Sequence, residues 1–279
     1  MSINEIARKC GVVLGWIAFL GVLVLALWYT SDQTKIVGGP VTTVCIHTKN
    51  DADSILLVQD GAAILIDAGE EVDAPHILEV LQQYGVEQLD YFILTHGDKD
   101  HVGGAARILS EVPARRVIQP YYEAGEMVDS LNAMLKKAGI PVIYPARTLR
   151  LQAGEMRFLV YPPLEGHYTD DNNYSLAVLV EHGQVRQLFA GDALRKRSEE
   201  LLLIDWPEVD LYKVPHHGRA NSATGDLFDA LQPQYAVVTA KSADEAVLQA
   251  AQRNHTQLFY TADGDCTFIS DGSTLQRAP

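Results

Sequence analysis

The chain has 279 residues, enough for one large α/β domain or two smaller ones, and its 47% hydrophobic content can supply a sizeable core. Its formal net charge of -14 argues against a surface that clamps nucleic-acid phosphates everywhere, so a polyanionic substrate would have to be held at a localised site. Three cysteines are too few to build a disulfide framework.

An apolar stretch without charged side chains occupies residues 11–29. As a helix it would be roughly 28 Å long, which matches the hydrocarbon core of a bilayer. Arg8 and Lys9 precede it and no basic cluster follows. The positive-inside tendency therefore predicts a short cytoplasmic N-terminus (1–10), one transmembrane anchor (11–29) and an extracytoplasmic remainder. A cleaved signal peptide is the alternative, although no clear small-residue cleavage site follows the stretch.

A linker over residues 30–40 leads into a domain predicted over 41–279, in which strands come first and then alternate with helices. The first predicted elements are strands 42–47, 54–59 and 62–67 and a helix over 74–84. Asp60-Gly61 joins the second and third strands as a hairpin turn. Asp67 ends the third strand, where it could simply start a turn or could orient a metal ligand from behind.

The motif after the next predicted strand, 89–94, has the spacing of a metal site. It reads LTHGDKDHVGG and sets two imidazoles and two carboxylates in one short loop, those of His96, Asp98, Asp100 and His101. A loop that leaves a rigid strand can turn alternate side chains inward, so the motif offers ligands to two adjacent cations. A polar turn that caps a helix is the simpler reading, but such a turn needs neither the paired histidines nor the glycine pair that follows.

The alternation of strands and helices continues to the C-terminus and predicts two packed sheets with helices outside. The further strands are expected at 117–119, 142–144, 156–161, 174–181, 187–190, 209–214, 235–239, 257–260 and 266–270. The further helices are expected at 127–137, 194–203, 220–231 and 243–253. Two strand ends carry candidate ligands, because Asp192 follows strand 187–190 and His216-His217 follows strand 209–214.

Four short motifs, ILIDAG, THGDKDHVGG, FAGDA and KVPHHG, together resemble the successive motifs of the metallo-β-lactamase superfamily. The resemblance implies an α/β fold, the αββα sandwich, with a dinuclear metal site in the cleft between the sheets. Two features are similar to the extracytoplasmic hydrolase domain of ComEC-type competence proteins. One is Asp98, at a position where histidine is more usual, and the other is the closing stretch FYTADGDCTFISDG. Only one membrane span is predicted here, so DNA transport is not inferred.

The resemblance also implies roles for the candidate residues. Six metal ligands are expected, namely His96, Asp98, Asp100, His101, Asp192 and His216. Asp192 would bridge two divalent ions, zinc or manganese, and Asp67 would support the ligands from the second layer. Asp98 in place of an imidazole hardens the first site and makes manganese a rival to zinc. Asp100 and His217 are the residues expected to act in catalysis, His217 either as the acid for the leaving group or as a partner of His216.

Two details depart from the superfamily pattern. The usual third histidine motif has no clear counterpart, because His167 comes early and the run Asp171-Asn172-Asn173 lies nearer to the following strand. An Asp or Asn of this run is expected at that position, with Asn173 facing the substrate. Basic residues near the cleft could hold a polyanion, or could simply face water, and these are Arg195, Arg197 and Arg219.

The sequence therefore predicts a membrane-anchored, dinuclear metal-dependent hydrolase outside the cytoplasm, acting on phosphodiesters such as DNA through an activated water. The alternatives are a hydrolase of envelope phosphodiesters or other esters, and a metal-binding scaffold without turnover. The expected partners are a phosphodiester substrate and the lipid bilayer, and no protein partner can be inferred.

Overall fold

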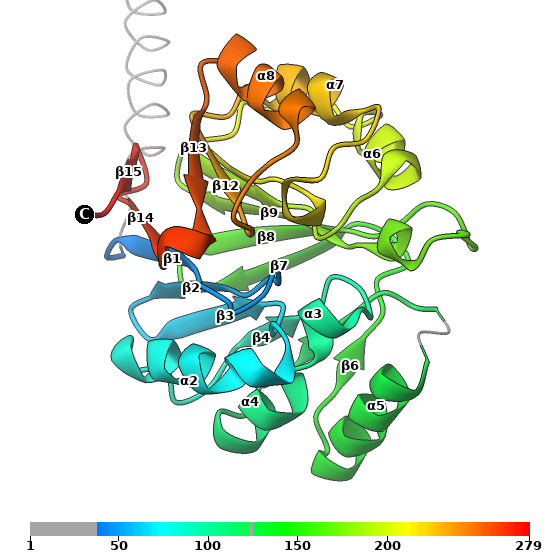
Figure 1. Cartoon of the computed structure of the whole chain (residues 1–279). Coiled ribbons are helices and arrows are strands. Elements are labelled where there is room, and N and C mark those ends of the chain that lie inside the picture. Colours follow the sequence, from blue (N-terminus) through cyan, green and yellow to red (C-terminus); the bar gives the residue numbers. More distant parts are fainter. Residues whose placement is uncertain (1–37, 123–124) are drawn as a thin grey trace, which may run out of the picture. The chain divides into compact units, whose positions relative to one another are not determined.

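Two β-sheets pack face to face, and helices cover the outer surface of each sheet (Figure 1). This αββα arrangement confirms the fold class expected from the sequence. The computed structural model describes residues 38–122 and 125–279, and the compact unit spans Gly38–Pro279. Within those residues no helix has the length and apolar character needed to cross a bilayer. The predicted anchor at 11–29 lies outside the described residues.

The first sheet has the strand order β15-β14-β1-β2-β3-β4-β5-β6. Its strands are β1 (Val41–Cys45), β2 (Ile55–Gln59), β3 (Ala62–Ile66), β4 (Tyr91–Ile93), β5 (Val117–Ile118), β6 (Val142–Ile143), β14 (Cys266–Ser270) and β15 (Leu275–Arg277). The strands from β3 to β6 are parallel, so their carboxyl ends lie along one edge of the sheet. Because β2 runs antiparallel to β3, the residues that precede β2 lie at this same edge.

The second sheet has the order β13-β12-β11-β10-β9-β8-β7. Its strands are β7 (Leu149–Ala153), β8 (Met156–Tyr161), β9 (Ala177–His182), β10 (Val185–Phe189), β11 (Leu211–Lys213), β12 (Tyr235–Val238) and β13 (Gln257–Tyr260). β9 is buried along almost its whole length, as its continuous apolar run predicts for a central strand. The strands from β10 to β13 are parallel and present a second set of carboxyl ends.

Three apolar clusters form the core. One lies between the sheets and contains the fully buried Phe158 and Phe268. The other two lie between each sheet and its helices. The helices are α2 (Ala74–Gln83), α3 (Lys99–Val102), α4 (Ala105–Glu111), α5 (Glu126–Ala138), α6 (Arg195–Leu201), α7 (Thr224–Leu231) and α8 (Glu245–Arg253). The helices α2 and α4 cover the first sheet, whereas α6, α7 and α8 cover the second (Figure 1).

Most predicted elements are present, with two differences at the sheet edges and one at a helix start. The short strands β7 and β15 are absent from the prediction, because edge strands keep polar residues on one face and lack a long apolar run. The helix expected from residue 220 begins at Thr224 instead. Its hydroxyl accepts a hydrogen bond from the backbone N–H of Asn221 at 2.9 Å, which holds the preceding residues in a turn.

Candidate metal centre

The loops at the carboxyl ends of four parallel strands bring the candidate ligands together. Asp67 follows β3, His96 follows β4, Asp192 follows β10, and His216 and His217 follow β11. Asp67, His216 and His217 all have positive φ values, 60°, 52° and 52°, in the left-handed region that side chains other than glycine rarely adopt. Such strained backbone is concentrated at functional sites, where the surrounding contacts hold it in place.

Two glycines permit close packing behind this edge. A Cβ on Gly104 would lie 2.3 Å from the backbone oxygen of Ala68, so only glycine lets the motif loop pack on the end of β3. Gly191 has a φ of 53°, and a Cβ there would lie 2.7 Å from Oγ1 of Thr95. Gly104 is therefore required by the packing of the motif loop on the end of β3, and Gly191 by its contact with Thr95, which follows β4 of the other sheet.

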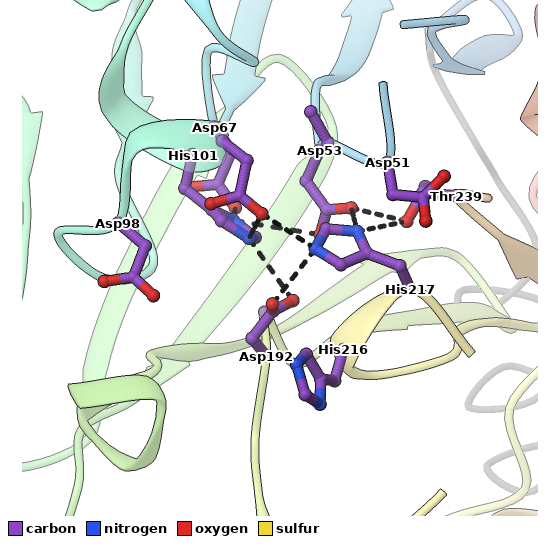
Figure 2. A network of polar contacts seen from close by, with 12 residues as sticks. Asp51, Asp53, Asp67, Asp98, His101, Asp192, His216, His217 and Thr239 are labelled. Carbon is purple, nitrogen blue, oxygen red and sulfur yellow. Dashed lines mark hydrogen bonds and ion pairs between the residues drawn. The ribbon is translucent and has the colours of Figure 1, made fainter. Parts of the chain in front are cut away.

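Four buried side chains converge at the centre of this edge (Figure 2). Asp53, His101, Asp192 and His217 each offer one ligand atom, and these four atoms lie within 4.8 Å of one another. Asp192 lies between the two imidazoles, with its Oδ2 3.0 Å from Nε2 of His217 and its Oδ1 3.3 Å from Nε2 of His101. Asp100 approaches the same imidazole nitrogen of His217 at 3.0 Å. A carboxylate shared by two imidazoles from different strands has the arrangement of a bridging metal ligand.

The histidines of the motif are oriented as metal ligands are. Nδ1 of His101 lies 2.8 Å from Oδ2 of Asp67, which also accepts a hydrogen bond from Oγ1 of Thr95 at 2.7 Å. This carboxylate favours the proton on Nδ1 and leaves Nε2 as a lone-pair donor. Among the described residues, the buried Nε2 atoms of His96 and His101 have no partner in hydrogen-bond geometry. Orphaned imidazole nitrogens beside carboxylates fit a divalent cation.

The charges of the cluster also favour a bound cation. Burial alone would lower the pKa of His217, but Asp53, Asp100 and Asp192 raise it to about 10. Burial likewise opposes charge on His101, whose pKa is nevertheless raised by Asp192 and Asp67. The excess of carboxylates thus favours positive charge at the imidazole positions. Metal ions compete with protons for such nitrogens, and the cluster provides the negative field that a divalent ion needs.

A buried lysine completes the cluster and was not predicted from the sequence. Lys213, fully buried at the end of β11, contacts Asp53 and donates to the backbone oxygen of Gly191 at 3.1 Å. Its Nζ also lies 3.5 Å from Oδ1 of Asp192. Asp53 in turn accepts a hydrogen bond from Oγ1 of Thr239 at 2.6 Å. The available sequence signal was weak, namely one lysine in an apolar strand and one aspartate in the turn before β2.

The two adjacent histidines of the KVPHHG motif occupy different positions relative to the cluster. His217, not His216, lies in the four-residue cluster, because its Nδ1 is held 3.0 Å from Oγ1 of Thr239 and 3.2 Å from Oδ1 of Asp53. His216 is half-buried beside Asp192, outside the cluster, and its Nε2 contacts the guanidinium of Arg219 at 3.2 Å (Figure 2). The structure therefore places His217, where the sequence favoured His216, among the candidate ligands, and the choice between the two stays a prediction.

The remaining predicted ligands lie at the side of the cluster. The ring of His96 packs against that of His101 with 4.1 Å between centroids. Oδ2 of Asp98 lies 3.5 Å from Nε2 of His96, and its side chain is 42% exposed, so it faces the open side of the site. His96 and Asp98 are adjacent to the cluster and can serve a second ion there. Their assignment as ligands stays a prediction.

Two of the expected substrate-binding residues instead stabilise the fold. Arg197 is 1% exposed, and its guanidinium donates to the backbone oxygens of Ser175 and Tyr161 and to the carboxylate of Glu200. Asn173 is 3% exposed and its Oδ1 accepts a hydrogen bond from the backbone N–H of Arg197 at 3.0 Å. Both predictions are corrected, because helix periodicity did not reveal that residue 197 faces inward. They join the loop before β9 to the start of α6.

The two exposed arginines are each paired with an acid. Arg195 lies 3.3 Å from Glu199 on the same helix, and Arg219 lies 3.6 Å from Asp51. Both side chains are more than half exposed. Their role in binding a polyanion stays a prediction, and the nearby carboxylates weaken the positive field that each can offer.

Comparisons with known proteins agree with the fold and with the Asp/His cluster described above. The family model described as "Metallo-beta-lactamase superfamily" matches residues 47–240. The chain is similar to ComE operon protein 3 of Bacillus subtilis, with 29% identity over 69% of this chain and 25% of that protein. It is also similar to Recombination protein 2 of Haemophilus influenzae, with 29% identity over 77% of this chain and 26% of that protein. Competence protein ComA of Neisseria gonorrhoeae is 27% identical over 78% of this chain and 30% of its own length. The chain thus spans between a quarter and a third of the length of these relatives.

Solved structures share the fold at low sequence identity. The metallo-beta-lactamase fold protein YhfI from Bacillus subtilis aligns with a TM-score of 0.59 and 14% identity, over 83% of this chain and all of that chain. CmlA, a diiron beta-hydroxylase from Streptomyces venezuelae, aligns with a TM-score of 0.54 and 16% identity, over 82% of this chain and 54% of that chain. These alignments support the fold, and they leave the reaction to be argued from the residues.

Proposed function

Because the chain belongs to the metallo-beta-lactamase superfamily and carries its Asp/His cluster, we propose that it is a dinuclear metal-dependent phosphodiesterase acting on DNA. The observation that carries this proposal is the position of Asp192 between the Nε2 atoms of His101 and His217. The names of the relatives, a competence protein and a recombination protein among them, support DNA as the substrate class. Hydrolysis of envelope phosphodiesters is the competing substrate class.

Each residue of the site has a role in this proposal. His101, His217 and Asp192, with Asp100, would hold one ion, and His96 and Asp98 with Asp192 would hold the other. Two bound ions, zinc or manganese, would supply a nucleophilic hydroxide at neutral pH and stabilise negative charge on the phosphoryl oxygens. Asp67 orients His101, and Lys213 holds Asp192 and Asp53 in place.

His216, the first histidine of the pair, is the better candidate for proton transfer during the reaction. Both ring nitrogens of His217 already face carboxylates or Thr239 inside the cluster. His216 is half-buried and lies beside Asp192, outside the cluster (Figure 2). Burial and the neighbouring Arg219 lower the pKa of His216, although Asp192 opposes them, so at neutral pH its ring is neutral and can accept a proton.

The test uses the full-length protein, stripped of metal and reloaded separately with manganese or zinc. Wild type and Asp192→Ala are compared on single-stranded DNA and on bis(p-nitrophenyl) phosphate. Asp226→Ala, an exposed aspartate at the start of α7, is the matched control. Metal-dependent cleavage of both substrates that is lost only in Asp192→Ala is the expected result. Cleavage of the small ester alone would direct the search to envelope phosphodiesters. Metal binding without turnover of either substrate would contradict the proposal and favour a metal-binding scaffold.

The predicted location is a further part of the proposal. Residues 11–29 would anchor the chain in the bilayer with the hydrolase domain outside the cytoplasm, as the apolar stretch and the preceding basic residues suggest. Full-length protein should remain in the membrane fraction after alkaline extraction, and a chain that begins at Gly38 should not. Digestion of the domain by protease added to intact spheroplasts is expected, whereas protection would reverse the orientation.

A further inference from the structure

A pocket of about 580 Å³ lies beside the metal-ligand motif, between the segment that follows β5 and the loop that precedes β9. Five tyrosines contribute to its lining, namely Tyr121, Tyr122, Tyr144, Tyr168 and Tyr174. Tyr121 is 82% exposed and Tyr144 is 41% exposed, whereas Tyr174 is buried. No metal ligand lines this pocket, and the proposed reaction assigns it no part so far.

The pocket is tied directly to the metal site. The phenol oxygen of Tyr122 accepts a hydrogen bond at 2.5 Å from the backbone N–H of Gly97, the residue between His96 and Asp98. The rings of Tyr122 and Tyr174 stack at 4.1 Å with 6° between their planes. Tyr174 is followed by Ser175, whose Oγ accepts a hydrogen bond from the backbone N–H of Asp192. The wall of the pocket is therefore held against the motif loop on one side and joined to the Asp192 loop on the other.

The chemistry of the lining suits an uncharged planar group and not a phosphate. Asp129 and Asp171 line the pocket, and none of the described lining residues is Lys or Arg. Tyr121 and Tyr144 meet edge to face, with centroids 5.7 Å apart and planes at 88°. Because Tyr121 is largely exposed, a ring face remains open for stacking.

A pair of amides adds hydrogen-bonding capacity. The side-chain nitrogen of Gln119 donates to Oδ1 of Asn132 at 2.5 Å and to the phenol of Tyr144 at 3.2 Å. These contacts fix the orientation of both amides. Among the described residues, Oε1 of Gln119 and Nδ2 of Asn132 have no hydrogen-bond partner, so one acceptor and one donor remain. A donor beside an acceptor next to an aromatic face is the combination that reads the edge of a splayed-out base.

We propose that this tyrosine pocket binds one nucleobase of a single-stranded nucleic acid whose adjacent phosphodiester lies at the metal cluster. The proposal rests on the phosphodiesterase function proposed above and names the part of the substrate that the protein recognises. Base stacking would supply affinity that the basic residues cannot. Arg195 and Arg219 are paired with acids, and Lys99 forms an ion pair with Glu70 at 2.5 Å. A sugar of a glycan phosphate is the competing occupant, because aromatic rings and carboxylates also bind sugars.

The experiment measures binding and cleavage separately with the full-length protein. Binding of fluorescent hexathymidylate and of an abasic hexamer with the same phosphates is measured by anisotropy in the presence of chelator. Cleavage of both hexamers and of bis(p-nitrophenyl) phosphate is measured with manganese. The variants are Tyr121→Ala and Tyr144→Ala, and the control is Leu203→Ala, which removes a side chain that is 78% exposed in the turn after α6.

The base-bearing hexamer is expected to bind more tightly than the abasic one, and each tyrosine variant should weaken it by about fivefold to hundredfold. Binding of the abasic hexamer should not change, and Leu203→Ala should behave as wild type. Equal binding of the two hexamers would overturn the proposal. An equal loss for both in Tyr121→Ala would also overturn it and would place the sugar in the pocket. Base-dependent binding without any phosphodiester cleavage would support the pocket and contradict the proposed activity.

Discussion

Replacing the buried Lys213 with methionine is predicted to destabilise the protein through the charge that it leaves behind. The ammonium group contacts Asp53, the backbone oxygen of Gly191 and Asp192, and both carboxylates are almost fully buried. Methionine matches the length of the lysine stem but carries no charge. Asp53 would then keep Thr239 and His217 as neighbours but would lose its lysine counterion.

The magnitude follows from the burial of this pair. Breaking a buried ion pair by removal of one partner costs about 3–5 kcal/mol, because the protonated His217 compensates only part of the buried carboxylate charge that remains. For a domain of this size each kcal/mol lowers the melting temperature by about 2–4 °C, so the melting temperature of Lys213→Met should fall by about 6–20 °C. Asp53→Asn in the same chain removes the carboxylate charge that Lys213→Met leaves without its lysine counterion. The double variant should therefore be more stable than the sum of the two single changes predicts, by about 2 kcal/mol or more.

The assay is denaturant unfolding of the chelator-treated protein, followed by circular dichroism for wild type, both single variants and the double variant. Chelator is needed because bound metal would partly offset the lost lysine charge. A free energy of unfolding for Lys213→Met within about 1 kcal/mol of wild type would refute the reasoning, since the buried charge would then cost little. Strict additivity of the two changes would refute it as well, because it would show that the two groups do not interact.

Three further outcomes are expected. Asp67→Asn should weaken metal binding by about 10- to 100-fold in calorimetric titration, because His101 loses the carboxylate that orients it; an unchanged affinity would remove Asp67 from this role. Arg197→Lys should lower the free energy of unfolding by about 2 kcal/mol or more, because the guanidinium donates hydrogen bonds to three buried acceptors. The KM for a small phosphodiester should not change in this variant. A raised KM at unchanged stability would instead support a role of Arg197 in substrate binding. In chelator, the protonation of His217 should stabilise the fold fully below about pH 6.5 and progressively less as pH rises through about 10, since its folded-state pKa is raised; unfolding curves of His217→Asn should lack this slope.

Local sequence patterns are sufficient to predict the fold class and the location of the site. Alternating strand and helix patterns predict the two sheets. The candidate ligands between His96 and His101 lie in one short loop, and the preceding strand pattern places this loop at a strand end. Asp192 was assigned the same way, from its place after a buried strand. These features are local, because a strand end and the loop that follows it are encoded by neighbouring residues. The anchor at 11–29 is also a local pattern, and it stays a prediction.

Which side chains meet depends on how the two sheets and their loops pack together. Positive φ values at both residues of the pair turn His217 inward and leave His216 outside the cluster. Asp53 and Lys213 are far apart in sequence and form an ion pair only because the two sheets pack against each other. Arg197 resembles a surface residue of a basic helix, yet its guanidinium bonds across to β8 and the loop before β9. Such pairings depend on long-range packing and side-chain orientation, which no local pattern in the sequence records.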